Sequence, residues 1–301
     1  MYNQMLVPLD GSEMAEVVFP YAKEIASGLG TEVVLLHISS QAVKDFQPMI
    51  RNYVDHAAEK IQSCATQGRP SQPIKIHGEF VTGYPADEII RYAEEKKVDL
   101  ILMASHGRSG SKRYSVGGTA DKVLRSAKTP VLLVPAGIPN QVPFDQWPTR
   151  SLVVPLDGSE LAESVFPHVE SLAGISNAQV ILLRICEPPA MPTYYSPELS
   201  EIPLHWGQYA QQETARCKEV SSKYLANIEA RFTKNNINVR SETLVGKAAD
   251  EIINYANKTP YGVIVMATHG RSGLSRLVYG SVAANILVGV TNPILLIKPT
   301  K

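Results

Sequence analysis

The sequence predicts an α/β protein made of two similar domains, each with a parallel sheet covered by helices on both faces. The two halves share short identical blocks: Val7–Glu13 and Val154–Glu160 both read VPLDGSE, and Ala86–Ile90 and Ala249–Ile253 both read ADEII. Within each half, apolar runs of strand length alternate with segments of helical periodicity. Strands that are apolar on both faces are typical of parallel sheets buried between helices.

The two copies differ in the length of their middle part. The VPLDGSE blocks are offset by 147 residues and the ADEII blocks by 163, so the second copy has gained 16 residues. Most of the gain is expected in Glu187–His205, which holds five prolines. Residues 137–150 contain three more prolines and are interpreted as a linker. The predicted domains are therefore residues 1–136 and 151–301.

The first copy predicts five strands and four helices in alternation. Ser12 is expected to cap a helix that runs to about Gly30, and Pro85 suits the first turn of a later helix. The other two helices are expected at 53–67 and 116–127. The expected strands are Met5–Leu9, Glu32–Ile38, Ile74–Val81, Asp99–Ala104 and Val131–Val134. The second copy repeats this order, with strands near 152–156, 178–185, 238–245, 261–267 and 294–297.

Composition excludes several classes of protein. Lys+Arg and Asp+Glu number 29 each, so no basic field favours nucleic acid or an anionic membrane surface. No apolar run approaches the roughly 18 residues of a membrane helix, and the N-terminus lacks a signal pattern. Cys64, Cys186 and Cys217 lie at unrelated spacings and are interpreted as free thiols. We expect a cytoplasmic protein without nucleic-acid or membrane partners.

Two loops in each copy carry the residues of a phosphate site. An aspartate, a glycine and a serine follow the first strand, at Asp10 and again at Asp157. A glycine-rich loop follows the fourth strand and leads into a helix, at Met103–Gly118 and again at Met266–Ser281. Backbone amides at such a helix start can bind phosphate oxygens, and a carboxylate can reach ribose hydroxyls or Mg²⁺. If the first and fourth strands are neighbours, both loops meet at one crevice.

Both halves resemble the universal stress protein family, and the whole chain resembles a tandem member. Nucleotide-binding members carry the motif G-x2-G-x9-G-[ST]; the second copy matches it at 267–281 and the first at 104–118. The Pro–x–Asp after the first strand also matches, at Pro8–Asp10 and Pro155–Asp157. The resemblance covers nearly all of both halves except the linker and Glu187–His205.

The resemblance implies a Rossmann-like fold with strand order 3-2-1-4-5 and a bound ATP, with Mg²⁺ held through the nucleotide by Asp10 or Asp157. It also implies that the last strands of the two units pair as an intramolecular pseudo-dimer, and it allows a homodimer of tandem chains. The implied nucleotide-binding residues in the first unit are Pro8, Asp10, Ile38, Met103, Ala104, Gly107, Arg108, Gly110, Gly117, Gly118 and Thr119. Those in the second unit are Pro155, Asp157, Ile185, Met266, Ala267, Gly270, Arg271, Gly273, Gly280, Ser281 and Val282.

The two copies depart from the motif to different extents. Alanine replaces the first motif glycine in both, which adds only one methyl group. Gly118, however, stands where the second copy has Ser281, and this removes a hydroxyl donor worth about 1.5–3 kcal/mol toward an anionic oxygen. We therefore predict that the second unit binds ATP about 10- to 100-fold more tightly than the first.

Simpler interpretations exist for the same residues. Asp10 and Asp157 would also serve as plain helix caps, and the loop glycines as turn residues. Arginines of the glycine loops, at 108, 113, 271 and 276, are more often solvated than bound to phosphate. His106 and His269 lack a visible catalytic partner and are expected to have structural roles. The aromatic segment Pro188–Trp206 is expected to form a surface flap or to cover a ligand.

The sequence thus predicts a universal stress protein that binds adenine nucleotide and acts as a regulatory protein in the stress response. Two alternatives stay open. One is a slow ATP hydrolase or nucleotidyl-transfer enzyme, although no residue is clearly placed to position the attacking water. The other is a dimeric interaction scaffold that binds no nucleotide.

Overall fold

The computed structural model describes residues 2–39, 47–66, 74–107, 116–136, 149–190, 202–270 and 279–299. The first unit contains a short 3-10 helix, η1 (Ala15–Val18), together with the following elements: β1 (Gln4–Leu9), α1 (Phe19–Leu29), β2 (Glu32–Ser39), α2 (Gln47–Thr66), β3 (Ile76–Thr82), α3 (Pro85–Glu95), β4 (Leu100–Ala104), α4 (Gly118–Ser126) and β5 (Val131–Val134).

The second unit repeats this order, with the short helix α5 in the place of η1. Its elements are β6 (Ser151–Pro155), α5 (Glu160–Glu163), α6 (Phe166–Ser176), β7 (Gln179–Cys186), α7 (Ile202–Lys234), β8 (Val239–Val245), α8 (Ala248–Asn257), β9 (Gly262–Ala267), α9 (Ser281–Gly289) and β10 (Ile294–Ile297).

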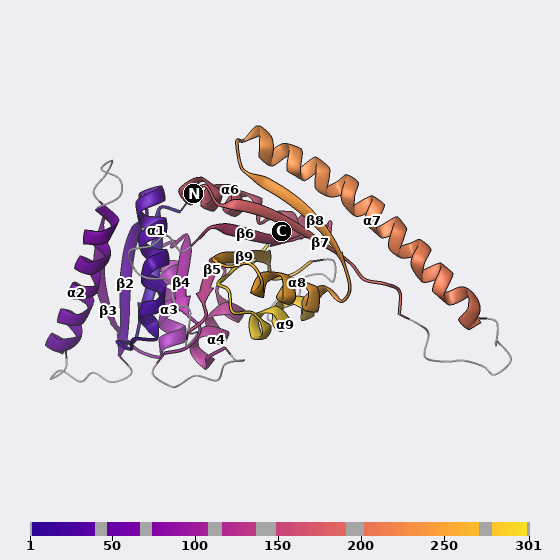
Figure 1. Cartoon of the computed structure of the whole chain (residues 1–301). Coiled ribbons are helices and arrows are strands. Elements are labelled where there is room, and N and C mark those ends of the chain that lie inside the picture. Colours follow the sequence, from indigo (N-terminus) through magenta and orange to yellow (C-terminus); the bar gives the residue numbers. More distant parts are fainter. Residues whose placement is uncertain are drawn as a thin grey trace.

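All described strands form one ten-stranded sheet in the order β3-β2-β1-β4-β5-β10-β9-β6-β7-β8 (Figure 1). Within each unit neighbouring strands are parallel, in the predicted order 3-2-1-4-5. The two last strands, β5 and β10, pair antiparallel, with Leu132 opposite Leu295. The predicted fold is therefore confirmed, and the pairing of the last strands is observed within one chain.

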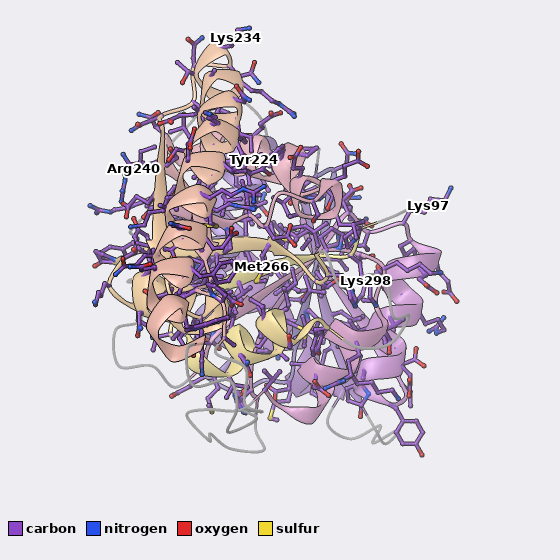
Figure 2. All side chains as sticks on the ribbon, turned by 90° about the vertical axis from the view of Figure 1, so that its right-hand side faces the viewer. Lys97, Tyr224, Lys234, Arg240, Met266 and Lys298 are labelled. Atoms are coloured by element: carbon purple, nitrogen blue, oxygen red, sulfur yellow. A yellow bond between two sulfur atoms is a disulfide. The ribbon has the colours of Figure 1, made fainter. Side chains whose placement is uncertain are left out.

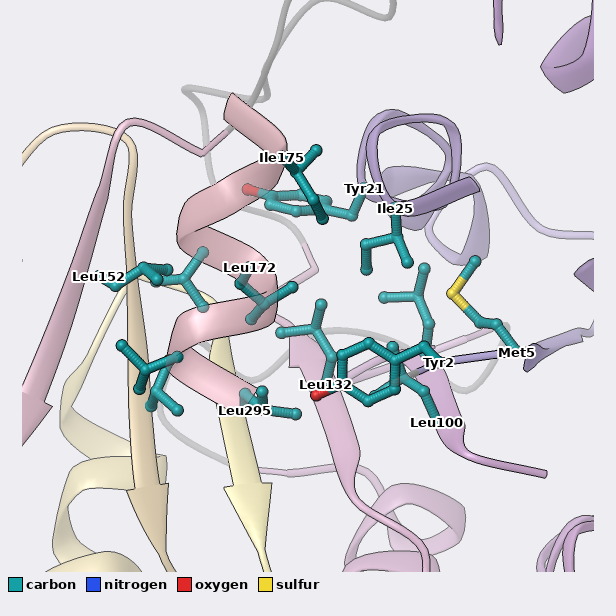
Figure 3. Close-up of a cluster of buried hydrophobic side chains, with 14 of the residues drawn as sticks. Tyr2, Met5, Tyr21, Ile25, Leu100, Leu132, Leu152, Leu172, Ile175 and Leu295 are labelled. Carbon is teal, nitrogen blue, oxygen red and sulfur yellow. The ribbon is translucent and has the colours of Figure 1, made fainter. Parts of the chain in front are cut away.

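Apolar side chains cover both faces of the sheet along its inner strands, whereas the edge strands β3 and β8 carry several polar residues. On one face, α1 of the first unit packs against α6 of the second; Figure 3 shows side chains of both helices above Leu132 and Leu295. The approach is close, since a Cβ at Gly28 would overlap the side chain of Ile175. The two units therefore share a continuous core rather than a thin connection.

Polar contacts also cross the junction between the units. The Tyr2 hydroxyl lies 2.6 Å from Nδ1 of His168, both buried. On the other face of the sheet, the Tyr279 hydroxyl donates to the Asp121 backbone oxygen at 3.2 Å. These polar groups have hydrogen-bond partners across the junction, so the packing of the two units does not leave them unsatisfied.

Three expectations about elements need correction. The helix predicted from Ser12 begins only at Phe19, after the 3-10 turn, and Pro20 sits in its first turn. The long insertion lies partly in α7, which has 33 residues where α2 has 20. Trp206 belongs to this helix rather than to a flap, while residues 191–201 of the expected flap and 137–148 of the predicted linker lie outside the described residues.

The prediction of free thiols is wrong for two of the three cysteines. Cys186 and Cys217 form a disulfide between β7 and α7, with their Cα atoms 5.9 Å apart. Spacing could not reveal this pair, because 31 residues separate them and only the packing of α7 brings them together.

Within the described part of the chain, every helix is too short or too polar to cross a bilayer.

Candidate functional site

In each unit the described residues form a pocket at the carboxyl ends of the strands, where the chain order in the sheet reverses. In the first unit, β1 lies between β2 and β4, so the connections after β1 and β4 leave toward opposite faces of the sheet. In the second unit β6 lies between β7 and β9 in the same way. Such reversal points are where open α/β sheets form ligand crevices.

The pocket of the first unit has a volume of about 250 Å³. It brings together all the predicted residues of that unit that lie in the described part of the chain, from four separate segments. These are Pro8, Asp10, Ile38, Met103, Ala104, Gly107, Gly117, Gly118 and Thr119.

The pocket of the second unit is about twice as large, at about 500 Å³. It likewise gathers the predicted residues of its unit, namely Pro155, Asp157, Ile185, Met266, Ala267, Gly270, Gly280, Ser281 and Val282. Arg108, Gly110, Arg271 and Gly273, the remaining predicted residues, lie outside the described residues.

The aspartate at each pocket is held by the serine two residues later. In the second unit, the Ser159 hydroxyl donates to Oδ1 of Asp157 at 2.6 Å and the Ser159 amide donates to the same oxygen at 2.9 Å. Ser159 itself caps α5 by accepting from the Ala162 amide. Gly158 has φ of 82°, the left-handed conformation that glycine adopts without strain. The aspartate is therefore not the helix cap but orients the residue that is.

The second carboxylate oxygen of each aspartate lies against a glycine of the opposite loop. A Cβ added at Gly270 would overlap Oδ2 of Asp157, and one at Gly107 would overlap Oδ2 of Asp10. In each pocket the carboxylate therefore contacts the glycine loop directly. Glycine is required at these positions because any side chain would displace the carboxylate.

Helices α4 and α9 begin at the pocket walls, and among the described residues no side-chain hydrogen bond caps their first amides. Gly117 and Gly280 are the N-cap residues and have no side chain that could cap the helix. The residues that open the helices, Gly118 and Ser281, both line their pockets. Uncapped amides at a helix start carry partial positive charge and favour an anion.

The charged residues distinguish the two pockets. Arg184 lines the second pocket and is buried, with its Nε donating to the Ser221 hydroxyl at 3.1 Å and its guanidinium 5.4 Å from the Tyr224 ring centre. The corresponding strand position in the first unit is His37, which is buried near Phe80. The second pocket therefore combines a carboxylate with a buried cation.

The two loop histidines have equivalent hydrogen-bond partners. His106 Nδ1 lies 3.0 Å from the Ser105 hydroxyl, and His269 Nδ1 lies 3.0 Å from the Thr268 hydroxyl. Burial lowers the pKa of His106, which keeps its ring neutral near pH 7. These contacts fit the structural role expected for both histidines.

Several lining residues were missed in the sequence. Ile89 and Ile252 reach the pockets from α3 and α8. Their segments Gly83–Ile89 and Gly246–Ile252 also resemble the family, but neither isoleucine was predicted to line a site. Arg184, Glu187 and Cys217 add polar atoms to the second pocket. Arg184 carried a signal of its own, since it replaces His37 as a lone charge within the apolar run VILLRI.

The described residues contain no group of three or more His, Cys, Asp or Glu side chains that could hold a metal ion. A cation at Asp10 or Asp157 would need further ligands from a bound molecule.

Comparison with known proteins identifies the family of the chain. The model of the universal stress protein family matches it twice, over residues 1–135 and 148–298. The chain belongs to the universal stress protein family. Universal stress protein Slr1230 of Synechocystis is 24% identical over 97% of this chain and 99% of its own length.

Other similar proteins cover one unit or share the fold. Universal stress protein YxiE of Bacillus subtilis is 32% identical over 44% of this chain and 99% of its own length. The crystal structure of protein PA1789 from Pseudomonas aeruginosa matches with a TM-score of 0.70 at 18% identity, covering 99% of this chain and 93% of its own. This universal stress protein therefore shares its two-unit fold with a solved structure.

Proposed function

We propose that this universal stress protein binds an adenine nucleotide in the second pocket, and more weakly in the first, and acts as a regulatory nucleotide-binding protein in the stress response. One observation carries the proposal: the Asp157 carboxylate contacts Gly270 in a pocket of about 500 Å³ that is also lined by Gly280 and Ser281 at the start of α9. A ligand that fits must offer hydroxyl donors and an anion a short distance apart. A nucleotide offers both.

The remaining walls suit the rest of such a ligand. Ile185, Ile252 and Met266 provide an apolar surface on which a base can lie. The volume falls within the 300–1,000 Å³ common for small-molecule sites, whereas the first pocket falls below it. A Mg²⁺ ion would neutralise phosphate charge and take one ligand from Asp157.

The test has two steps on the full chain. Mass spectrometry of small molecules released on denaturing the purified protein identifies any nucleotide that it carries. Calorimetric titration of the emptied protein with ATP then measures the two sites. We expect the tighter site to disappear in Asp157→Ala and to persist in Asp10→Ala. Asp157→Asn keeps the acceptor for Ser159 and controls for loss of the α5 cap.

The opposite outcome is equally clear. If no nucleotide is released and ATP does not bind to the wild-type chain, the proposal is wrong and the pockets serve another purpose. If ATP binds but Asp10→Ala removes the tighter site, the ranking of the two pockets is wrong.

A further inference from the structure

The disulfide of the second unit lies at the wall of its pocket. Cys186 is the last residue of β7 and directly follows Ile185, which lines the pocket. Cys217 lies on α7 and lines the pocket itself. Cys186 is fully buried, whereas Cys217 is half-buried. A small reagent in the pocket would therefore meet the sulfur of Cys217 first.

The disulfide is also the outermost anchor of α7. From Trp206 to Val220 no side chain of this helix is buried, and Figure 1 shows that part extending beyond the body of the protein. The following part packs on the sheet through Ser221, Leu225, Ile228 and Phe232; Figure 2 shows Tyr224 on this stretch of the helix. Without the bond, the turn that carries Cys217 would be held mainly by Ser221.

The surroundings of the two sulfurs favour exchange. The Ser221 hydroxyl lies 3.5 Å from Sγ of Cys186 and 3.8 Å from Sγ of Cys217. The same hydroxyl accepts from Nε of the buried Arg184. A thiolate formed at Cys186 would thus have a hydroxyl donor beside it and a guanidinium one contact further away. Both stabilise the leaving group in thiol–disulfide exchange.

The first unit lacks this arrangement. Ser39 ends β2 as Cys186 ends β7, so no sulfur stands at that position of the first pocket. Cys64 lies on α2, and its side chain is outside the described part. The protein therefore carries one pocket with a cysteine pair and one without.

We propose that Cys186 and Cys217 form a reversible redox site whose disulfide strengthens ligand binding in the second pocket and leaves the first pocket unaffected. The inference rests on the proposed function, since it regulates the same nucleotide site. Disulfides in reducing compartments are usually transient or redox-sensing rather than structural, which agrees with this role.

The chemistry balances with a small-molecule disulfide, RSSR, as the oxidant. The Cys217 thiolate attacks one sulfur of RSSR, forms a mixed disulfide and expels RS⁻. The Cys186 thiolate then attacks the Cys217 sulfur and expels the second RS⁻. The two protons from the cysteines end on two RSH molecules, so the pair loses two electrons and RSSR gains them. Reduction by a thiol runs the same steps backwards.

The direction of coupling follows from the anchoring of α7. With the bond formed, the turn that carries Cys217 is already in its place on the pocket wall, so a ligand loses less entropy in ordering it. Linkage is reciprocal: a ligand that prefers the oxidised pocket must stabilise the disulfide by the same factor. A bound ligand would also cover the Cys217 sulfur.

The experiment measures both sides of this cycle on the full chain. ATP affinity of the second site is measured by calorimetry after treatment with oxidised glutathione and after treatment with dithiothreitol. Peptide mapping under non-reducing conditions confirms the Cys186–Cys217 bond. The disulfide is then titrated in dithiothreitol redox buffers with and without saturating ATP. Cys217→Ser removes the pair, and Cys64→Ser is the matched control.

We expect about 5-fold tighter binding or more in the oxidised protein. A 5-fold effect corresponds to a fall of about 21 mV in the reduction potential of the disulfide with ATP bound. Cys217→Ser should bind as the reduced protein does under both treatments, and Cys64→Ser should respond like the wild type.

Equal affinity in the two redox states, or tighter binding when reduced, overturns the inference while leaving nucleotide binding intact. Failure of the bond to form under oxidised glutathione overturns it in the same way. ATP binding in neither state overturns the proposed function, and the inference falls with it.

Discussion

The two pockets have the same backbone plan but different side chains around it. Each has an aspartate held by the serine two residues later, a glycine against that carboxylate, and an uncapped nine-residue helix. The second adds Ser281 where the first has Gly118, Arg184 where the first has His37, and a disulfide where the first has Ser39. Duplication preserved the candidate anion site, whereas the surrounding wall diverged. These differences predict that the two pockets bind the same ligand with different affinities.

The largest expected effect concerns the buried junction that joins the two units. Burial lowers the pKa of His168, at the junction of the units, to about 4 from 6.5. The folded protein therefore favours the neutral ring: this stability is complete above about pH 6.5 and is lost as the pH falls toward 4. Denaturant unfolding should show a loss of about 3 kcal/mol across that window.

His168→Gln is the control for this effect, because it can still bond the Tyr2 hydroxyl but does not titrate. Its stability should depend less on pH between 4 and 6.5 than that of the wild type. An identical pH dependence in both proteins would show that the titration of His168 does not change the free energy of unfolding.

The next effect concerns the feature that the pockets share. Gly270→Ala places a methyl group where the Asp157 carboxylate lies, so the carboxylate must move. We expect about 100-fold weaker ATP binding at the second site, near the upper end of overpacking costs. Calorimetry measures the affinity, and thermal unfolding reports whether the fold survives.

Gly174→Ala is the matched control, since this glycine is inside α6 and a Cβ there meets no atom within 4 Å. It should leave ATP binding unchanged. Unchanged binding in Gly270→Ala as well would mean that the ligand does not depend on the position of Asp157.

The smallest effect concerns the residue that differs at the helix start. A Cβ at Gly118 meets nothing within 4 Å, so Gly118→Ser can add the missing hydroxyl without a clash. We expect about 10-fold tighter ATP binding at the first site, and a similar loss at the second site in Ser281→Gly. Measuring both in backgrounds with the other site disabled separates the two. If neither exchange alters affinity, the smaller volume of the first pocket, rather than the hydroxyl, sets its weakness.

The residues of the two candidate anion sites could be predicted because they are local in sequence. Loop glycines, the Asp–Gly–Ser turn and a helix start are recognisable within about fifteen residues, and duplication repeats them in both halves. The resemblance to a known family implied the strand order, and this order placed the two loops at the same crevice. Ile89 and Ile252 lie in segments that resemble the family, but their place in the pockets was missed because only the packing of α3 and α8 on the sheet brings them to the loops.

Local periodicity and repetition thus determined the two units, their strands and the residues of each candidate anion site, because the spacing of apolar residues and the glycines of a turn are properties of neighbouring residues in the chain. Packing decided the rest. The course of α7, the pairing of Cys186 with Cys217 and the burial of Arg184 at the second pocket depend on contacts between segments that are 30 residues or more apart. Such contacts are set by the shape of the assembled core, which only the folded chain possesses.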